Sequence, residues 1–555
     1  MSLYKDASLV MLPSAYKDGK LYSIRPTDGS GDFTFSRGTN LSATRVNASQ
    51  LIEKGRENVL LYSQDFSQAA WSKTNLSLTA NQTDPLGGTN AFLFTSTSAS
   101  GNLFVQSLSN QNKVCSIYAK AGNRSIFAIV NNSYGNGATF NLSAETAVSS
   151  GQGSLAVIED VGNGWFRCSV YFSLGTQFLV VLSDVNGNGY SNGDTISFFG
   201  SQMELGTIAT PYIETGASTA QAGILENTPR LDYSGGASCP SLLLEPQRSN
   251  FIPHSEHFSD WLLDGNGDGQ SVTANYAISP EGVQNAYRLQ LSIINGTYSR
   301  IRKSVTDSYS GAGVFSVYLK TNDGSTKTIS MRWGGSGAVS KTITSEWQRF
   351  DVSGTAIYTL AQDHELFIGS AEGDSDVVDL SIYGAMQESG NFSTSYIPTY
   401  GVSQTRAEES ATTASSDLIS TQAFTMFFEH KALGISGTSW AYALEMADGS
   451  DEIEFYVNGG FGMNIYLGGN GGYIFGASSN DGYRAGLASK VALSYDGDKL
   501  SYFINGSLYN SATGVSFSDV NTYLNLRSSR NIALKQSLVF PTALTDSEAI
   551  ALTTI

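Results

Sequence analysis

Cysteine, histidine, proline and charge are all scarce in this chain of 555 residues. Its three cysteines, Cys115, Cys168 and Cys239, are too few for a disulfide framework, and their odd number leaves at least one unpaired. The sequence contains no Cys-x-x-Cys pair, no phosphate-binding glycine loop and no Gly-x-Ser-x-Gly nucleophile elbow. The familiar redox, nucleotide-binding and serine-hydrolase motifs are therefore all missing.

Positive charge is also in short supply. Lysine and arginine total 32 against 49 aspartates and glutamates, which gives a formal net charge of −17. Nucleic-acid affinity comes mainly from Lys and Arg that neutralise phosphates, so we expect no nucleic-acid partner. No apolar run approaches the length of a membrane span, and the SLVML run near the N-terminus is shorter than a signal-peptide core. We expect a chain made in a cytoplasm that leaves it only by lysis or within a particle.

Strand-like alternation fills the rest of the chain. Segments such as GVFSVYLKT, VVDLSIYGAMQ and KVALSYDGDKLSYFING place β-branched and aromatic residues at every second position. Many of the 58 glycines separate these runs as tight turns, which predicts an all-β fold of sandwiches or jelly rolls. We expect a helix over Thr545–Leu552, where Thr545 and Glu548 have the spacing of a capping box.

An internal repeat is the strongest structural signal. Three blocks occur twice in the same order: E-x-x-R-x-N with S-x-x-F, then V-x-S-x-Y-x-K, then G-x-x-x-E ending in Y-I-x-T. The first copy contains Glu53, Arg56, Asn58, Ser63, Phe66, Val114, Ser116, Tyr118, Lys120, Gly200, Glu204, Tyr212, Ile213 and Thr215. The second contains Glu245, Arg248, Asn250, Ser255, Phe258, Val314, Ser316, Tyr318, Lys320, Gly384, Glu388, Tyr396, Ile397 and Thr399. The period is far too long for a solenoid, so we predict two copies of one β module with the same strand topology.

The repeat divides the chain. We assign an N-terminal anchor segment (1–60), jelly-roll module 1 (61–215), a connecting segment (216–250), jelly-roll module 2 (251–400), a linker (401–422) and a C-terminal sandwich (423–555). Residues 1–60 have too little apolar periodicity to fold alone. We therefore expect this segment to attach the protein to other components of a particle.

Several segments carry a family resemblance. GDFTFSRGTNLSATRVNASQLIE (31–53), NTPRLDYSGG (227–236) and SLLLEPQRSN (241–250) resemble recurrent segments of tailed-bacteriophage virion proteins, of the head-fibre or tail-fibre type in marine and crAss-like phages. The repeated module is similar to carbohydrate-binding-module jelly rolls. The C-terminal region resembles a concanavalin A-like (laminin-G-like) sandwich, above all in VALSYDGDKLSYFINGSLYN with Asn505-Gly506 at its second turn. The resemblance implies attachment or decoration and transfers no catalytic residue.

The nearest approach to a catalytic site is the pair Glu452 and Glu454. Strand alternation places the two residues on one face, about 6.5–7 Å apart, whereas a retaining glycosidase needs about 5–5.5 Å between its carboxyls. The Glu-x-Asp-x-x-Glu arrangement of laminarinase-type relatives would need a third acid where Val457 stands. We interpret the pair as a solvated strand face and expect no enzymatic activity.

Two oxygen-rich loops could hold structural Ca²⁺. Asp264, Asn266 and Asp268 match the first half of an EF-hand loop, but Asn275 takes the place of its bidentate Glu and the flanks are not helical. A glycine-rich hairpin tip is the alternative interpretation. A weaker version comprises Asp184, Asn186, Asn188 and Asp194. His254 and His257, three residues apart with no cysteine nearby, do not predict a zinc site.

Aromatic side chains are the candidates for sugar stacking. Most aromatics of a β-sandwich fill its core, so we assign the repeated Trp165, Trp347, Tyr118 and Tyr318 to the cores. Aromatics in loops, or not shared between the copies, are better ligand candidates. These are Trp71, Tyr134, Tyr190, Trp333, Trp440, Tyr473 and Tyr483.

These observations lead to one hypothesis with two alternatives. We expect a non-enzymatic virion protein, a fibre or decoration, that displays glycan-binding modules as a homodimer or homotrimer, because linked copies raise avidity. It would need no cofactor apart from structural Ca²⁺. The alternatives are a particle-borne polysaccharide hydrolase with accessory binding modules, and a head decoration protein without a ligand.

Overall fold

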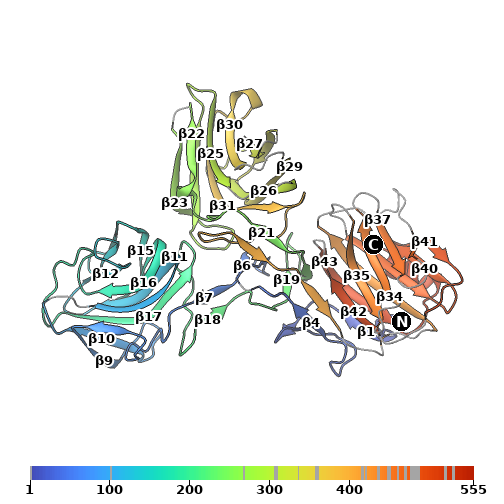
Figure 1. Ribbon diagram of the computed structural model, residues 1–555, viewed down its shortest axis with the longest axis horizontal. Coiled ribbons are helices and arrows are strands. Elements are labelled where there is room, and N and C mark those ends of the chain that lie inside the picture. The colour runs from blue at the N-terminus through green and yellow to red at the C-terminus, as the bar shows by residue number, and fades with distance from the viewer. Residues whose placement is uncertain are drawn as a thin grey trace.

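The structure is a computed structural model. It describes residues 3–39, 41–99, 103–266, 269–305, 311–334, 337–356, 362–413, 418, 422–433, 438–446, 452–458, 462–467, 472–475, 488–517, 522–527 and 532–555. Figure 1 shows three β-sandwiches around a small central region: module 1 in blue to cyan, module 2 in green to yellow and the C-terminal sandwich in orange and red. The predicted all-β fold class is confirmed. Within the described ranges no helix is both long and apolar enough to span a membrane.

Module 1 is a jelly roll whose longest strands run through both of its layers. The sheet order is β14-β13-β12-β16-β11-β17-β10-β9, with β15 paired to β16 and β8 paired to β11. Its strands are β8 (Ser72–Thr74), β9 (Leu76–Gln82), β10 (Ala91–Ser96), β11 (Leu103–Ala121), β12 (Ile126–Val130), β13 (Gly137–Asn141), β14 (Thr146–Ser150), β15 (Gly153–Gly162), β16 (Trp165–Val181) and β17 (Thr195–Leu205).

Module 2 has the same plan with its long strands divided. One sheet has the order β22-β25-β30-β27-β28 and the other β23-β24-β31-β26-β29. The strands are β22 (Leu262–Gly265), β23 (Ser271–Ala277), β24 (Ala286–Ser292), β25 (Tyr298–Val305), β26 (Gly311–Thr321), β27 (Lys327–Trp333), β28 (Val339–Ile343), β29 (Gln348–Ala356), β30 (Gln362–Gly369) and β31 (Val377–Ser389), with the 3-10 turns η2 (Phe258–Asp260) and η3 (Ser370–Glu372).

The two modules correspond strand by strand. Residues 103–107 and 113–121 of β11 pair as β25 and β26 do, and residues 165–172 and 177–181 of β16 pair as β29 and β30 do. The strands β8, β9, β10, β12, β13 and β17 correspond to β22, β23, β24, β27, β28 and β31. Strands β14 and β15 are an extension specific to module 1. The prediction of one shared topology is therefore confirmed.

A buried asparagine from the repeat closes each jelly roll. Asn58 donates from its side-chain amide to the backbone carbonyls of Ser201 (3.0 Å) and Ile213 (2.8 Å). Its Oδ1 accepts the backbone N–H groups of Leu60 and Met203. Asn250 makes the same four bonds in module 2, with Ala385, Ile397, Ile252 and Gln387. One side chain thus ties the entry of the module to its last strand.

The repeated glycine has a steric cause. Gly200 and Gly384 have φ angles of +56° and +61°, a region that favours glycine. A Cβ at Gly200 would lie 3.1 Å from the ring of Tyr118, and one at Gly384 would lie 3.3 Å from the ring of Tyr318. The repeated blocks therefore encode the closure of the fold.

The C-terminal sandwich has two sheets, of order β19-β20-β43-β34-β39-β40-β41 with β1 on β43, and β2-β3-β4-β33-β42-β35-β36-β37-β38. The first contains β1 (Leu9–Met11), β19 (Arg230–Asp232), β20 (Ser241–Leu244), β34 (Phe424–Ala432), β39 (Ala488–Tyr495), β40 (Leu500–Ile504), β41 (Ser507–Ala512) and β43 (Ile532–Phe540). The second contains β2 (Tyr16–Lys17), β3 (Lys20–Leu21), β4 (Phe33–Ser36), β33 (Ser410–Thr412), β35 (Thr438–Met446), β36 (Glu452–Asn458), β37 (Gly462–Leu467), β38 (Gly472–Phe475) and β42 (Thr522–Arg527).

Local predictions for the sandwich are confirmed. Asn505-Gly506 turns β40 into β41 with positive φ at both residues. The helix α1 (Asp546–Thr553) begins at Thr545, and its capping box with Glu548 is present.

The sandwich also corrects the predicted domain plan. Leu9, Phe33 and Phe35 are fully or almost fully buried in its core, and β1 and β4 pair with β43 and β33. Residues 9–36 are therefore part of the sandwich and not a separate anchor. Strands β19, β20 and β33 likewise move parts of the connecting segment and the linker into the sandwich. The local pattern of such short strands is too weak to reveal partners hundreds of residues away.

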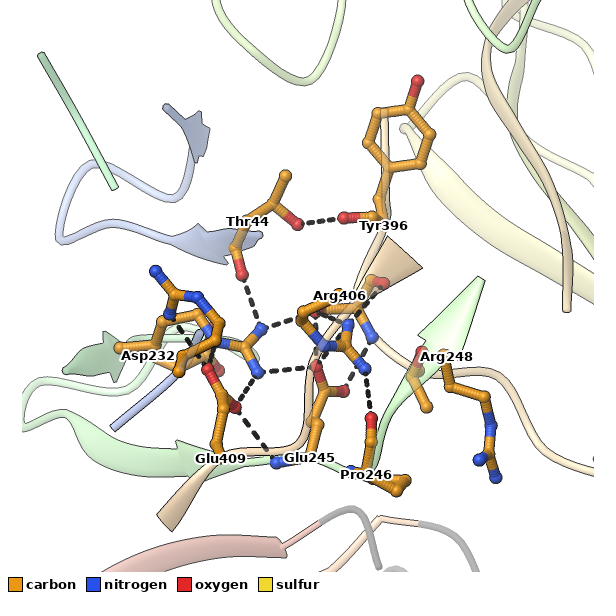
Figure 2. Close-up of polar contacts among 12 residues, drawn as sticks. Thr44, Asp232, Glu245, Pro246, Arg248, Tyr396, Arg406 and Glu409 are labelled. Carbon is orange, nitrogen blue, oxygen red and sulfur yellow. Dashed lines mark hydrogen bonds and ion pairs between the residues drawn. The ribbon is translucent and has the colours of Figure 1, made fainter. Parts of the chain in front are cut away.

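A buried network of charged side chains occupies the central region, where the three sandwiches meet (Figure 2). We call Arg37, Arg230, Glu245, Arg406 and Glu409 the charged junction; each side chain is at most 1% exposed. Glu409 pairs with Arg37 (3.0 Å), and Glu245 pairs with Arg230 and Arg406 (both 2.8 Å). Burial would raise the pKa of Glu245, but the two guanidinium groups lower it to about 2. The junction joins segments that are far apart in the sequence.

Short strands surround this junction. They are β5 (Thr44–Val46), β6 (Ile52–Lys54), β7 (Arg56–Asn58), β18 (Ala220–Ala222), β21 (Arg248–Asn250) and β32 (Gln404–Arg406). Elsewhere, the 3-10 turn η1 (Leu3–Lys5) packs against the same apolar cluster of the C-terminal sandwich as α1.

Candidate ligand-binding face

One sheet of module 2 carries a charged face. Residues of β22, β25, β27 and β30 alternate between the core and the opposite side of the sheet. Ile301, Met331 and Leu366 are fully buried in the core. The alternate positions form a surface that we call the outer face of module 2. It consists of Asp264, Tyr298, Arg300, Arg302, Ser330, Arg332, Glu365 and Phe367.

Ion pairs connect these side chains across the strands. Asp264 binds both Arg300 and Arg302, the latter at 2.9 Å. Glu365 binds Arg300 at 3.0 Å and Arg332 at 3.3 Å. The hydrogen bond from Arg300 lowers the pKa of Asp264 and raises that of Arg300, so both groups are ionised over a wide pH range. The outer face is thus a fixed array of guanidinium donors.

Aromatic rings accompany the charges. The guanidinium of Arg332 lies 4.8 Å from the ring centre of Phe367, and that of Arg300 lies 5.4 Å from the ring centre of Tyr298. Tyr298 is 38% exposed at one end of the face, and Leu262 is 52% exposed opposite Arg302. Phe367 is 4% exposed beneath Arg332, so Tyr298 is the ring of this pair that can reach a sugar, which offers both apolar ring faces and hydroxyls.

Module 1 has an apolar surface in the same place. The positions equivalent to Arg300, Arg302, Glu365, Phe367, Ser330 and Arg332 are Leu103, Val105, Leu179, Val181, Ala128 and Val130. Ala128, Val130 and Val181 are almost fully buried, and they pack with Val185 from the loop between β16 and β17. That loop spans residues 182–194, whereas its equivalent in module 2 spans only 370–376. The longer loop packs on the face of module 1 through Val185. The shorter loop reaches Ser330 through Asp374 and leaves the guanidinium groups of Arg300, Arg302 and Arg332 partly exposed.

The sequence argument missed this face, although a signal for it existed. It searched each motif singly and took the repeat as evidence of the fold only. A position-by-position comparison of the two copies would have shown Arg300 and Arg302 where module 1 has Leu103 and Val105.

The predicted calcium loop contributes a residue to this face instead. The carboxylate of Asp264 is paired with arginines, and Oδ1 of Asn266 accepts the backbone N–H groups of Thr297 and Tyr298. Asp268 lies outside the described residues. The structure therefore does not bring Asp264 and Asn266 together as ligands of one ion.

The second oxygen-rich loop is a set of turns. Oδ1 of Asp184 accepts the backbone N–H groups of Asn186 and Asn188, while Asp194 pairs with Arg124 at 3.2 Å. Among the described residues, no cluster of three His, Cys, Asp or Glu side chains has the arrangement of a metal site.

Two of the predicted sugar-stacking tryptophans belong to the cores. Trp71 is 1% exposed and packs between Phe104 and Phe178, and Trp333 is fully buried beside His364. Neither ring can present a face to a ligand, so these two assignments are wrong. Strand position alone does not reveal which face of a sheet is covered.

The other aromatic candidates differ in how much the structure describes. Tyr134 is 44% exposed, lies against Gly187, and is close enough to half-buried Tyr190 for the two phenols to interact. Burial, with Tyr190 as a second cause, raises the pKa of Tyr134. For Trp440 in β35 and Tyr473 in β38 only the backbone is described, and Tyr483 lies outside the described residues.

The aromatics assigned to the cores are only partly internal. Trp165 is buried, but Trp347 is half-buried and donates its Nε1–H to the carbonyl of Ile278. Tyr118 and Tyr318 are half-buried beneath Arg167 and Arg349.

The histidines act at the boundary between the two modules. Nδ1 of His257 lies 2.9 Å from Asp260 and that of His254 lies 3.3 Å from it. The ring of His257 also packs on Tyr171 of module 1 with 4.9 Å between ring centres. Glu452 and Glu454 lie in β36, of which only the backbone is described.

A second buried charged cluster attaches the central region to module 2. Lys54 pairs with Glu256 (2.9 Å) and Glu281 (2.5 Å), and Tyr383 donates to Glu281 (2.5 Å). Burial lowers the pKa of Lys54, but the two carboxylates outweigh it and keep the pKa well above its ordinary value. Each acid is therefore held by a cation, which makes this cluster a structural connection.

Solved structures with similar folds include carbohydrate-binding modules. The chain is similar to the CBM40 of the Ruminococcus gnavus IT-sialidase bound to α2,3-sialyllactose, at 16% identity over 24% of this chain and 84% of that chain, with a TM-score of 0.21. It is also similar to the CBM22-1–CBM22-2 tandem of Paenibacillus barcinonensis Xyn10C, at 13% identity over 60% of this chain and 98% of that chain, with a TM-score of 0.21. No curated protein gives a significant sequence match.

The C-terminal part has a family match. Residues 406–547 match the family described as the concanavalin A-like lectin/glucanases superfamily. The matched range contains β33 to β43 and ends at the start of α1. The strands contributed by residues 9–36 and 230–244 lie outside it. The C-terminal domain of this chain is a concanavalin A-like sandwich, joined to two jelly rolls.

Proposed function

We propose that this chain is a non-enzymatic glycan-binding protein and that the outer face of module 2 is its binding surface. The single observation that carries the proposal is the difference between two faces of identical topology. Module 1 packs a residue of its own loop on an apolar face, whereas module 2 keeps three partly exposed guanidinium groups beside the exposed ring of Tyr298. The lectin-like family match of residues 406–547 agrees with this function.

A glycan array with matched variants tests the binding surface. Tyr298→Ala removes an exposed ring from the outer face, and Tyr276→Ala removes a ring that is 41% exposed on the opposite sheet of the same module. Both tyrosines have an arginine over the ring, at 5.4 Å and 4.9 Å. We expect Tyr298→Ala to weaken glycan binding about fivefold and Tyr276→Ala to leave it unchanged, since a stacking contact contributes roughly 1 kcal/mol. Equal effects of both variants would contradict the proposed surface.

We propose further that the protein is displayed on a tailed-phage particle as a fibre or decoration, in two or three copies. Supporting this are the segments 31–53, 227–236 and 241–250, which resemble virion proteins, and the avidity that weak single sites require. Immunogold labelling of purified particles tests the location and mass photometry tests the copy number. A monomer that is absent from particles, or one that releases reducing sugars from a polysaccharide, would contradict this assignment.

A further inference from the structure

We infer that module 1 has a binding site of its own, a pocket at one end of the jelly roll that takes one or two units of a neutral sugar. The inference goes beyond the proposed function, because the pocket shares no residue with the outer face of module 2. It follows from the same end of the two modules, from the side chains that line the pocket and from the backbone of Tyr62.

The repeat identifies the same end in both modules. The indole of Trp71 donates to the carbonyl of Tyr62 (3.0 Å), and the indole of Trp261 donates to that of His254 (3.3 Å). Tyr62 and His254 are therefore equivalent, and so are the residues that follow each of them in the repeated block. The loops 83–90 and 278–285, which join equivalent strands, have the same length and complete this end.

In module 2 this end is filled by other parts of the chain. Lys54 of β6 pairs with Glu256 and with Glu281 of the loop 278–285. The ring of His257 packs on Tyr171 of module 1, with 4.9 Å between ring centres. Module 2 therefore uses this end for contacts inside the molecule.

Module 1 lacks the residues that make those contacts. Gln64 and Leu86 stand where module 2 has the two carboxylates that hold Lys54. Asp65 stands in place of His257. Leu86 is 73% exposed, so its loop is not covered at this position. No segment equivalent to β6 can be held here by an ion pair.

An open pocket occupies this end of module 1. Its volume is about 370 Å³, which lies at the lower end of the range for ligand pockets, about 300–1,000 Å³. Gly216 contributes to the space because it stands where module 2 has the ring of Tyr400. The side chains of Asn81, Asn90 and Glu214 line the pocket and make no hydrogen bond or ion pair within the described residues. Amide donors beside carbonyl and carboxylate acceptors match sugar hydroxyls, which both donate and accept.

Tyr62 adds a strained backbone to the pocket wall. Its φ is +50°, in a region that is costly for a bulky side chain. His254 at the equivalent position has no positive φ, so the fold itself does not require this conformation. The backbone N–H of Tyr62 donates to the carbonyl of Gly216 at 2.8 Å and helps to hold it. Strain that the fold does not need is typical of ligand sites, where it positions a side chain.

The charges of the lining favour a neutral ligand. The described residues that line the pocket include the carboxylates of Asp65 and Glu214 and no lysine or arginine. Asp65 accepts hydrogen bonds from Ser67 and lies near Lys73, so Glu214 is the carboxylate left to accept a sugar hydroxyl. An acidic sugar would bring a second negative charge beside Glu214 and be repelled.

Titration of the full chain with single sugars tests the pocket. Saturation-transfer NMR would use glucose, galactose and mannose, each beside its own uronic acid. We expect at least one hexose to bind about fivefold or more tightly than its acid form. Glu214→Gln should weaken that binding about tenfold or more, because a hydrogen bond to a charged acceptor is lost, and should abolish the preference for the hexose. Asn81→Gly should weaken it about 3- to 10-fold without strain, since the φ of +60° suits glycine.

Two substitutions elsewhere in module 1 are the matched controls. Glu159→Gln removes an exposed carboxylate from β15, and Asn163→Gly removes an exposed amide at a φ of +55° between β15 and β16. Both should leave hexose binding unchanged, as should Tyr298→Ala in module 2. Thermal unfolding should show that all the variants are folded.

Three results would overturn the pocket. They are hexose binding that Glu214→Gln and Asn81→Gly leave intact, an acid form that binds as tightly as its hexose, and failure of all three hexoses to bind. None of them decides the proposed function, because oligosaccharide binding that is weakened by Tyr298→Ala would still support the outer face of module 2.

Discussion

Module 1 and module 2 share a topology and a set of closing hydrogen bonds, yet their equivalent outer faces are opposite in character. Val130 of module 1 is 1% exposed and packs with Val185 of the loop 182–194, while the side chain of its equivalent Arg332 is 32% exposed. The shared closing bonds give hydrogen-bond partners to buried backbone groups, and every copy of the fold needs such partners. The difference lies in one loop and six side chains. The same fold therefore carries an apolar outer face in one copy and a charged outer face in the other.

The largest effect should come from removing residues 1–36. Five side chains in this segment, Leu9, Met11, Leu21, Phe33 and Phe35, are buried in the core of the C-terminal sandwich. At about 1.5–3 kcal/mol each, their loss amounts to about 8–15 kcal/mol, which is as large as the whole stability of an ordinary domain, about 5–15 kcal/mol. Hydrogen exchange should show the sandwich unprotected and both jelly rolls still protected. Retained protection of β34 and β43 would contradict the role assigned to this segment.

The closing hydrogen bonds that the two modules share can be removed in either module by replacing its buried asparagine. Asn58→Ala and Asn250→Ala each leave two backbone carbonyls and two N–H groups without their partner. Each substitution should destabilise its own module by about 3 kcal/mol or more, since a buried unsatisfied group costs about 1–3 kcal/mol. Hydrogen exchange reads the two modules separately, and the unsubstituted module serves as the control. Clearly unequal costs would show that the two closures are not equivalent.

Exchanging equivalent residues tests the difference between the faces. Val130→Arg puts an unpaired charge beneath the loop of module 1 and should cost about 3 kcal/mol. The reciprocal Arg332→Val removes one partly exposed ion pair and should cost less than about 1 kcal/mol. Chemical unfolding of the full chain, with hydrogen exchange to assign the module, measures both. If Val130→Arg were tolerated as well as Arg332→Val, the face of module 1 could not be covered as described.

The smallest effect concerns pH. The pKa of Asp264 is lowered by the hydrogen bond from Arg300, so its pairing stabilises module 2 above the ordinary value of 3.8. This contribution disappears as pH falls below 3.8 through the lowered pKa, because the folded carboxylate must then take a proton. Asp264→Asn should therefore lower the stability of module 2 by less than about 1 kcal/mol near neutral pH. The variant and the original chain should become equal in strong acid, and a difference that persists there would contradict this assignment.

The charged junction gives a structural role to the three segments that resemble virion proteins. Arg37, Arg230 and Glu245 lie in the three segments that resemble virion proteins, and in the structure they form the charged junction. The resemblance therefore falls on residues that join the sandwiches to one another. The surface that we propose to bind a ligand lies in module 2, outside those segments.

The sequence by itself determined the features that depend on near neighbours. Alternation predicted the strands, the repeat predicted two modules of one topology, Asn505-Gly506 predicted a hairpin turn, and Thr545 with Glu548 predicted the start of α1. The strands, the turn and the helix start depend on side chains a few residues apart, and the repeat shows one module twice without any knowledge of its long-range contacts. Only the tertiary structure decided which faces are covered. It placed Trp71 and Trp333 inside, paired Asp264 with arginines and brought β1 and β4 into the C-terminal sandwich. Burial is a property of what packs above a residue, and here that partner comes from distant loops and strands that no local pattern specifies.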